Sequence, residues 1–238
     1  MGSRTNTHPR CEHCLLHPHL CICADFRPFA TRTRLALIWH RIEAVKPTNT
    51  GRLALRTLEN SESYIRGIQN APADLSPLED PERRLLVLYP APDARVLTQA
   101  IIDEDPRPIT LAVPDATWTQ ARRSVNREPA LANAEKVIPP PGPPTQYQLR
   151  QEHHDDYLAT IEAIARAFGV LEGPEAQAEL ERIFLLMVDR TLQMRNQPPQ
   201  NPDRPKRKGW MPREEYEAYL REKRAADATA ASAASKDD

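Results

Sequence analysis

Glycine and aromatic residues are both scarce in this sequence of 238 residues. There are 7 glycines against 24 prolines, and Phe, Trp and Tyr together make up 5% of the chain. Because proline fixes its own φ angle, this balance predicts that many connections between secondary-structure elements are stiff.

Long hydrophobic runs are also absent. No apolar stretch reaches the roughly 20 residues that a transmembrane helix needs, and the N-terminus has no apolar core of a signal peptide. We therefore expect a soluble, cytoplasmic protein that has no membrane partner.

Excess charge of one sign is missing from the chain as a whole, since the formal net charge is −1 at pH 7. The distribution is nevertheless uneven, because residues 1–60 hold nine Arg and Lys against four acids. A local positive excess favours a polyanion or phosphate partner there. A merely solvated basic face is an equally good interpretation of charge alone.

Cysteine is confined to one short segment, where four residues follow the pattern C-x2-C-x6-C-x-C: Cys11, Cys14, Cys21 and Cys23. Four thiolates at this spacing can surround one tetrahedral zinc ion, and the metal would supply the folding energy that so small a unit lacks. Disulfides are the alternative, disfavoured because nothing marks the chain as secreted. One of the nearby histidines (His13, His17, His19) can replace a thiolate. We predict a structural zinc knuckle over residues 1–30, without the open coordination position of a catalytic zinc.

Apolar patterns further along predict alternating strands and helices. Strands are expected over 34–40, 84–90 and 108–114 and from residue 136, and helices within 46–58 and over 117–128, 157–169 and 178–194. Thr117 with Gln120 fits a capping box, and Gly169 is expected to end its helix. Such alternation predicts an α/β fold, a mainly parallel sheet with helices on both faces. The tail over 198–238 is basic and then low in complexity, so we expect it to be disordered.

Polar and aromatic residues gather where the predicted strands end. Tyr89 and Pro90 follow one strand, Asp115–Trp118 follow another, and the proline-rich stretch 139–150 follows a third. Ligands of open α/β sheets bind at the carboxyl ends of strands. The sequence therefore predicts a ligand site at this edge.

Six short motifs occur in an order that resembles one known family. They are CEHCLLHPHLCICADF (11–26), KPTNTGRLA (46–54), LYP (88–90), DATWTQAR (115–122), YQLR (147–150) and LATIEAIA (158–165). The order is similar to that of the DTW-domain proteins, the tRNA-uridine aminocarboxypropyltransferases. The likeness covers about residues 10–195 and departs at Ala159, where relatives tend to carry a small polar residue.

The resemblance implies a catalytic domain over 31–197 related to the SPOUT methyltransferases, with a knotted site for S-adenosylmethionine. It implies transfer of the 3-amino-3-carboxypropyl group of that co-substrate to N3 of a tRNA uridine, with release of 5′-methylthioadenosine. A monomer is the oligomeric state that it favours.

The catalytic residues that the resemblance implies are Asp115, Thr117 and Trp118. Asp115 would take the N3 proton or stabilise the anion, because a carboxylate in hydrogen-bond reach can act as a base. Trp118 would stack on a flipped base or wall the co-substrate pocket. The alternatives are that Asp115 caps a helix, that Trp118 is a core aromatic and that Thr117 serves the helix alone.

The residues implied to bind S-adenosylmethionine are Leu88, Tyr89, Pro90, Asp115, Pro139, Leu149, Arg150, Thr160 and Glu162. Arg150 would pair with a carboxylate or a phosphate, and Glu162 with the ammonium of the transferred group. The residues predicted to bind RNA are Lys46, Asn49, Thr50, Arg52 and Arg122, since a helix start suits a phosphate. Ordinary strand ends, helix caps and a solvated acid are the alternatives.

Three functions remain open from the sequence. The first is aminocarboxypropyl transfer to tRNA, with ribosomal RNA as a related substrate. The second is a SPOUT-type RNA methyltransferase. The third is a zinc-knuckle RNA-binding protein without catalysis, which would bind no S-adenosylmethionine.

Overall fold

The computed structural model describes residues 10–147, 149 and 157–194. Arg150, the tail over 198–238 and the first nine residues of the predicted knuckle lie outside these ranges. Among the described residues, none of the helices combines the length and the apolar composition that crossing a membrane requires.

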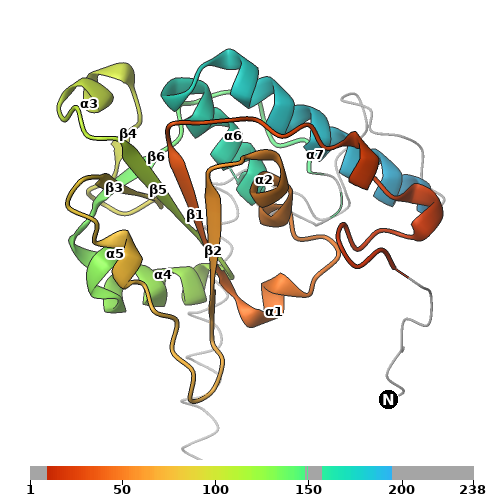
Figure 1. Ribbon diagram of the computed structural model, residues 1–238, viewed down its shortest axis with the longest axis horizontal. Coiled ribbons are helices and arrows are strands. Elements are labelled where there is room, and N and C mark those ends of the chain that lie inside the picture. The colour runs from red at the N-terminus through yellow and green to blue at the C-terminus, as the bar shows by residue number, and fades with distance from the viewer. Residues whose placement is uncertain (1–9, 148, 150–156, 195–238) are drawn as a thin grey trace, which may run out of the picture.

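The centre of the fold is one sheet of six parallel strands in the order β2-β1-β5-β3-β6-β4 (Figure 1). The strands are β1 (Arg34–His40), β2 (Ser61–Arg66), β3 (Arg84–Leu88), β4 (Arg95–Val96), β5 (Ile109–Asp115) and β6 (Glu135–Ile138). The helices are α1 (Arg41–Ala44), α2 (Gly51–Thr57), α3 (Gln99–Asp103), α4 (Trp118–Arg127), α5 (Pro129–Asn133), α6 (Thr160–Leu171) and α7 (Pro174–Met194). Single 3-10 turns occur at η1 (Pro18–Leu20), η2 (Cys23–Asp25) and η3 (Ser76–Leu78). The predicted mainly parallel sheet is confirmed.

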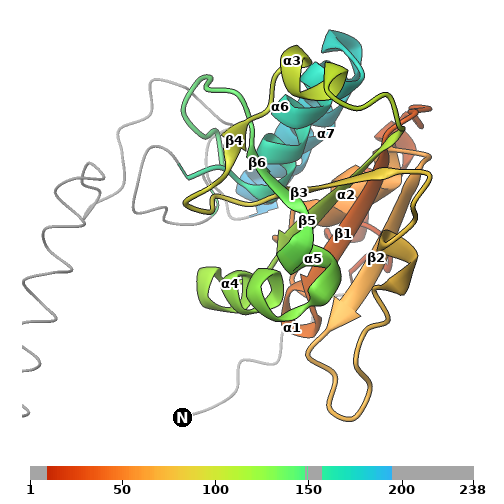
Figure 2. The ribbon, with the colours of Figure 1, turned by 90° about the vertical axis from the view of Figure 1, so that its left-hand side faces the viewer.

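Both faces of the central strands β1, β3 and β5 are buried, as their near-continuous apolar sequences require. Successive residues of β1 point to opposite faces, so Leu35 and Leu37 join one hydrophobic cluster while Ala36 and Ile38 join the other. The larger cluster is covered by α2, α6 and α7, and the smaller one by α4 and α5. Figures 1 and 2 show these two groups of helices on opposite sides of the strands.

The cysteine-containing segment packs onto this core. Leu16 and Ile22 are fully buried in the larger cluster, and Arg182 of α7 donates to the carbonyl of Asp25. Phe29 forms a parallel bridge with Leu58, which follows α2. The described part of the predicted knuckle therefore shares its hydrophobic core with the α/β domain.

The predicted helix over 157–169 runs instead from Thr160 to Leu171, and the one over 178–194 begins earlier, at Pro174. Gly169 does not end its helix, because α6 continues through it to Leu171. The residue with a left-handed backbone is Gly173, with φ of +101°, and α7 begins at the next residue. Gly173 therefore supplies the turn that was predicted for Gly169.

Candidate active site

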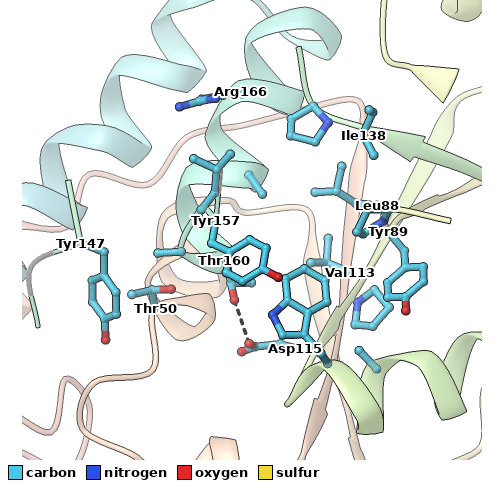
Figure 3. Close-up of a pocket in the computed structure, with 18 of the residues that line it drawn as sticks. Thr50, Leu88, Tyr89, Val113, Asp115, Ile138, Tyr147, Tyr157, Thr160 and Arg166 are labelled. Carbon is cyan, nitrogen blue, oxygen red and sulfur yellow. Dashed lines mark hydrogen bonds between the residues drawn. The ribbon is translucent and has the colours of Figure 1, made fainter. Parts of the chain in front are cut away.

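A cavity of about 1130 Å³ opens at the carboxyl edge of the sheet. Its wall comes from the segments that follow four parallel strands: Glu43–Thr50 after β1, Tyr89 and Pro90 after β3, Ala116–Trp118 after β5 and Pro139–Pro144 after β6. The first turns of α6 close it (Figure 3). The strand ends singled out in the sequence therefore meet around one cavity, and its use as a ligand site stays a prediction.

Asp115 lies at the base of this cavity as the last residue of β5, with 7% of its surface exposed. The Asn49 amide donates to Oδ2 at 2.6 Å, and the Thr160 hydroxyl donates to Oδ1 at 2.8 Å. Figure 3 shows Thr160 pointing at this carboxylate. Residues 66 and 45 positions away in the sequence thus fix both oxygens of Asp115.

Three helix N-termini converge near the Asp115 carboxylate. Thr160 is the first residue of α6, and Trp118 opens α4 three residues after Asp115. Gly51 opens α2, so close that a Cβ there would lie 2.7 Å from Oδ2 of Asp115. Because the N-terminus of a helix carries a partial positive charge, this corner stabilises negative charge.

The alternative that Asp115 caps α4 is excluded, since Thr117 is the N-cap. The Thr117 hydroxyl accepts from the backbone N–H of Gln120 at 3.4 Å. In return, the side-chain oxygen Oε1 of Gln120 accepts from the backbone N–H of Thr117 at 3.2 Å. The predicted capping box is therefore present. Thr117 also lines the cavity, so capping and a place in the site go together.

Trp118 lies at the cavity wall with 53% of its surface exposed, which excludes the core-aromatic alternative. Its ring stands 5.3 Å from the ring of Tyr157, at an interplanar angle of 42°. The exposed Trp118 ring, backed by the half-buried Tyr157, offers a stacking surface for a planar ligand at the cavity.

The proline-rich segment (residues 139–147) forms one side of the cavity and is fastened to α6 by Glu162. The Glu162 carboxylate accepts from the Thr145 hydroxyl at 2.6 Å, the Gln146 amide at 2.8 Å and the Ala159 amide at 2.7 Å. Burial raises the pKa of Glu162, against the lowering effect of these bonds. Tyr147 closes the other end, its hydroxyl donating to the Thr48 carbonyl at 2.6 Å.

Most of the residues predicted to bind S-adenosylmethionine line this cavity. They are Leu88, Tyr89, Pro90, Asp115, Pro139 and Thr160. Leu149 is absent from the lining and buried in the larger hydrophobic cluster. Glu162 is also absent from the lining, and its carboxylate accepts from the three donors named above. We therefore replace the predicted ammonium-binding role of Glu162 by a structural one.

The residues predicted to bind RNA fall into three groups. Lys46, Asn49 and Thr50 line the cavity, although Asn49 and Thr50 are almost fully buried. Arg122 is exposed on α4. Arg52 corrects the prediction: it is 8% exposed, is absent from the lining and donates to the Ala44 carbonyl at 2.5 Å, so it presents no surface to a phosphate.

Sequence reasoning missed Tyr157 and Arg166, which both line the cavity. Arg166 lies two turns into α6 and donates to the Pro143 carbonyl. No motif marks either position, because their place in the site depends on how α6 meets the proline-rich segment.

The four cysteine sulfurs form a separate cluster in which all Sγ atoms lie within 4.8 Å of one another. Sγ separations are 3.5 Å for Cys11–Cys23, 3.7 Å for Cys14–Cys21 and 3.6 Å for Cys11–Cys21. A tetrahedral ion with metal–sulfur bonds of about 2.3 Å separates its sulfurs by roughly 3.8 Å. All four are free thiols and no described histidine joins the group, so the cluster fits a metal held by sulfur alone.

The local environment treats these thiols unequally. Backbone amides of Cys14 and His13 lower the pKa of Cys11 to about 6, whereas burial raises the pKa of Cys14 and of Cys23. Packing several thiolates together without a cation is unfavourable, and a bound metal removes that penalty.

Comparison with known families gives one extensive match. The DTW domain matches residues 8–192, which is more than half of the chain. A solved structure of the SAM-dependent rRNA:acp-transferase Tsr3 from Vulcanisaeta distributa is similar with a TM-score of 0.41 and 15% identity, over 68% of this chain and 79% of that one.

Curated relatives include proteins named tRNA-uridine aminocarboxypropyltransferase 2. The Drosophila melanogaster protein is 28% identical over 74% of this chain and 72% of its own length. The Macaca fascicularis protein is 26% identical over 69% of this chain, and the match spans 57% of its own length. The Mus musculus protein is 25% identical over 69% of this chain, and the match spans 57% of its own length.

Proposed function

Because this chain belongs to the DTW-domain family, we propose that it is an aminocarboxypropyltransferase that modifies tRNA uridine with S-adenosylmethionine as co-substrate. The observation that carries this proposal is the cavity around Asp115. It unites a buried carboxylate, the exposed Trp118 ring with its neighbour Tyr157, and the ends of four parallel strands in one place. The names of the curated relatives support the same reaction.

The size of the cavity supports a site for two partners. Pockets for one drug-sized ligand typically hold about 300–1,000 Å³, and this cavity of about 1130 Å³ exceeds that range. We assign the apolar side, with Leu88, Pro90 and Pro139, to S-adenosylmethionine. The side with Trp118 and Tyr157 is assigned to a uridine base stacked on an aromatic ring.

The proposed reaction is a substitution at the carbon of the aminocarboxypropyl chain that is bonded to sulfur. N3 of uridine forms the new N–C bond, the C–S bond breaks, and its electron pair stays on sulfur in 5′-methylthioadenosine. The N3 proton passes to Asp115, which must lie within hydrogen-bond reach of it. All three carbons on the sulfonium are activated, so the product depends on which carbon the site aims at N3.

Asn49 and Thr160 have positioning roles in this mechanism. Each donates to one oxygen of Asp115, so together they hold the carboxylate in a fixed orientation at the cavity. Thr117 keeps α4 anchored beside Asp115 through its capping box. Arg150, outside the described residues, stays a predicted partner of the co-substrate carboxylate.

We further propose a SPOUT-like knot around the co-substrate site. Support comes from the proline-rich segment, which follows β6 and returns across the strand ends to Tyr147, whose hydroxyl donates to the Thr48 carbonyl just before α2.

We also propose that the four cysteines hold a structural zinc ion. Their free thiols suit a reducing cytoplasm, where a monomer is expected.

The test is incubation of the purified protein with unmodified tRNA and S-adenosylmethionine, followed by mass spectrometry of the digested nucleosides. The expected product is a uridine heavier by one aminocarboxypropyl group, with 5′-methylthioadenosine released. A methyl adduct with S-adenosylhomocysteine would instead identify a methyltransferase. No adduct on several tRNAs and ribosomal RNA would leave a binding role.

A further inference from the structure

Helix α4 carries a one-sided set of arginines that the reaction does not use. Its sequence from Trp118 to Arg127 is WTQARRSVNR, which contains three arginines and no acid. Ala121, Ser124 and Val125 face the core, and Arg122, Arg123 and Arg127 are exposed. We call these three side chains the arginine face.

The acidic side chain that follows α4 does not neutralise the arginine face. The nearest acid in the sequence, Glu128, pairs with Arg66 of β2, and the same arginine donates to Ser124 on the inner side of α4. None of the ion pairs within the described ranges includes Arg122, Arg123 or Arg127. Three unneutralised positive charges on one short surface favour a polyanion.

The arginine face begins at the mouth of the cavity. Trp118 opens α4 and lines the cavity, and Arg122 lies one turn further on. At 1.5 Å per residue, Arg127 is about 13 Å from Trp118 along the helix axis. Figure 2 shows α4 extending from the strand ends along the outside of the sheet. An RNA strand whose base stacks on Trp118 would therefore run beside the positive charges of the arginine face.

We propose that the arginine face binds the phosphate backbone of the RNA next to the modified uridine, with Arg123 and Arg127 as the contacts furthest from the cavity. This inference rests on the proposed function, since it takes RNA as the polyanion. Phosphate contacts fix the register of a nucleic acid without reading its sequence. The arginine face thus sets how the nucleotide enters the cavity.

The experiment compares two charge-matched double variants in a salt titration of tRNA binding by fluorescence anisotropy. Arg123→Gln with Arg127→Gln removes the distal half of the arginine face and leaves Arg122 and the cavity unchanged. The control, Arg27→Gln with Arg32→Gln, removes two exposed arginines near the start of β1, at the opposite edge of the sheet. The logarithm of the binding constant falls linearly with the logarithm of the salt concentration, and each lost phosphate contact reduces the magnitude of this slope by about 0.7 to 0.9.

We expect the α4 variant to lower the magnitude of this slope by about 1.4 to 1.8 and the control to leave it unchanged. Binding of S-adenosylmethionine, measured by calorimetry, should be equal in both variants and the wild type. A slope of the α4 variant equal to that of the wild type would overturn the proposal, as would a wild type that binds no tRNA. A wild type that transfers nothing, while the α4 variant still lowers the slope, would refute the proposed reaction and support the arginine face.

Discussion

Replacing Gly51 with alanine tests whether the close packing of the first residue of α2 against Asp115 fixes the position of the Asp115 carboxylate. A Cβ at position 51 would lie 2.7 Å from Oδ2 of Asp115 and 2.9 Å from a methyl carbon of Leu37. Both distances are shorter than van der Waals contact, and Leu37 is fully buried in the core. The carboxylate is the group with room to move, because it borders the cavity.

The free energy of unfolding should change little or fall. Overpacking a core costs about 1–3 kcal/mol, while alanine in a helix is favoured over glycine by up to about 1 kcal/mol. The net destabilisation of Gly51→Ala is therefore between roughly zero and 3 kcal/mol. Activity should suffer more, since a shift of Asp115 breaks its 2.6 Å bond to Asn49. A displacement of about 1 Å in an active site costs on the order of 100-fold in rate.

Gly169→Ala in α6 is the matched control. There the added Cβ would meet Oε1 of Gln177, which can turn away, and Cβ of the same residue at 3.3 Å, which requires only a small shift between α6 and α7. We expect this variant to gain up to about 1 kcal/mol and to keep its activity. The assays are urea unfolding and the rate of aminocarboxypropyl transfer. The reasoning fails if Gly51→Ala gains as much stability as the control and transfers at the wild-type rate.

Three further substitutions test single residues. Asp115→Asn should retain binding of S-adenosylmethionine in calorimetry and lose about 10²–10⁴-fold in transfer rate, the usual contribution of a general base; an unimpaired rate would remove Asp115 from that role. Ala159→Ser supplies the side-chain N-cap that α6 lacks, so the urea midpoint should rise by the equivalent of about 0.5–2 kcal/mol, and an unchanged midpoint would count against a missing cap. Cys21→Ser should lower zinc content, measured by atomic emission, together with the melting temperature; stoichiometric zinc at unchanged stability would disprove the four-thiolate site.

The strands with strong apolar runs could be predicted from the sequence, and the polar edge strand could not. RLALIWH forms β1 as expected, and the strands ending at Leu88 and Asp115 differ from prediction by at most two residues. β2, with the sequence SESYIR, was missed because it is an edge strand that alternates partly buried and exposed positions without an apolar run. Its pairing with β1 stabilises it, and that information is not local.

The candidate site shows the same division between local and distant information. Strand ends and the Thr117 capping box are local patterns, so the wall of the cavity could be predicted. The contacts of Asp115 with Asn49 and Thr160 join three separate helix starts, and no spacing in the sequence specifies them. The burial of Arg52 could not be predicted either, because the motif KPTNTGRLA does not specify whether its arginine is exposed.

The proline-rich segment has a consequence for the entropy of ligand binding. Five prolines line the cavity over residues 139–144, and the segment is bonded to α6 through Thr145 and Gln146. A flexible loop would lose backbone freedom on closing over a ligand, but proline has already lost most of its own. The wall therefore has less backbone freedom to lose when the proposed co-substrate binds, so more of the contact energy remains as affinity. Release of the product should then require no unfolding of this wall, and turnover would be governed by the RNA side of the cavity.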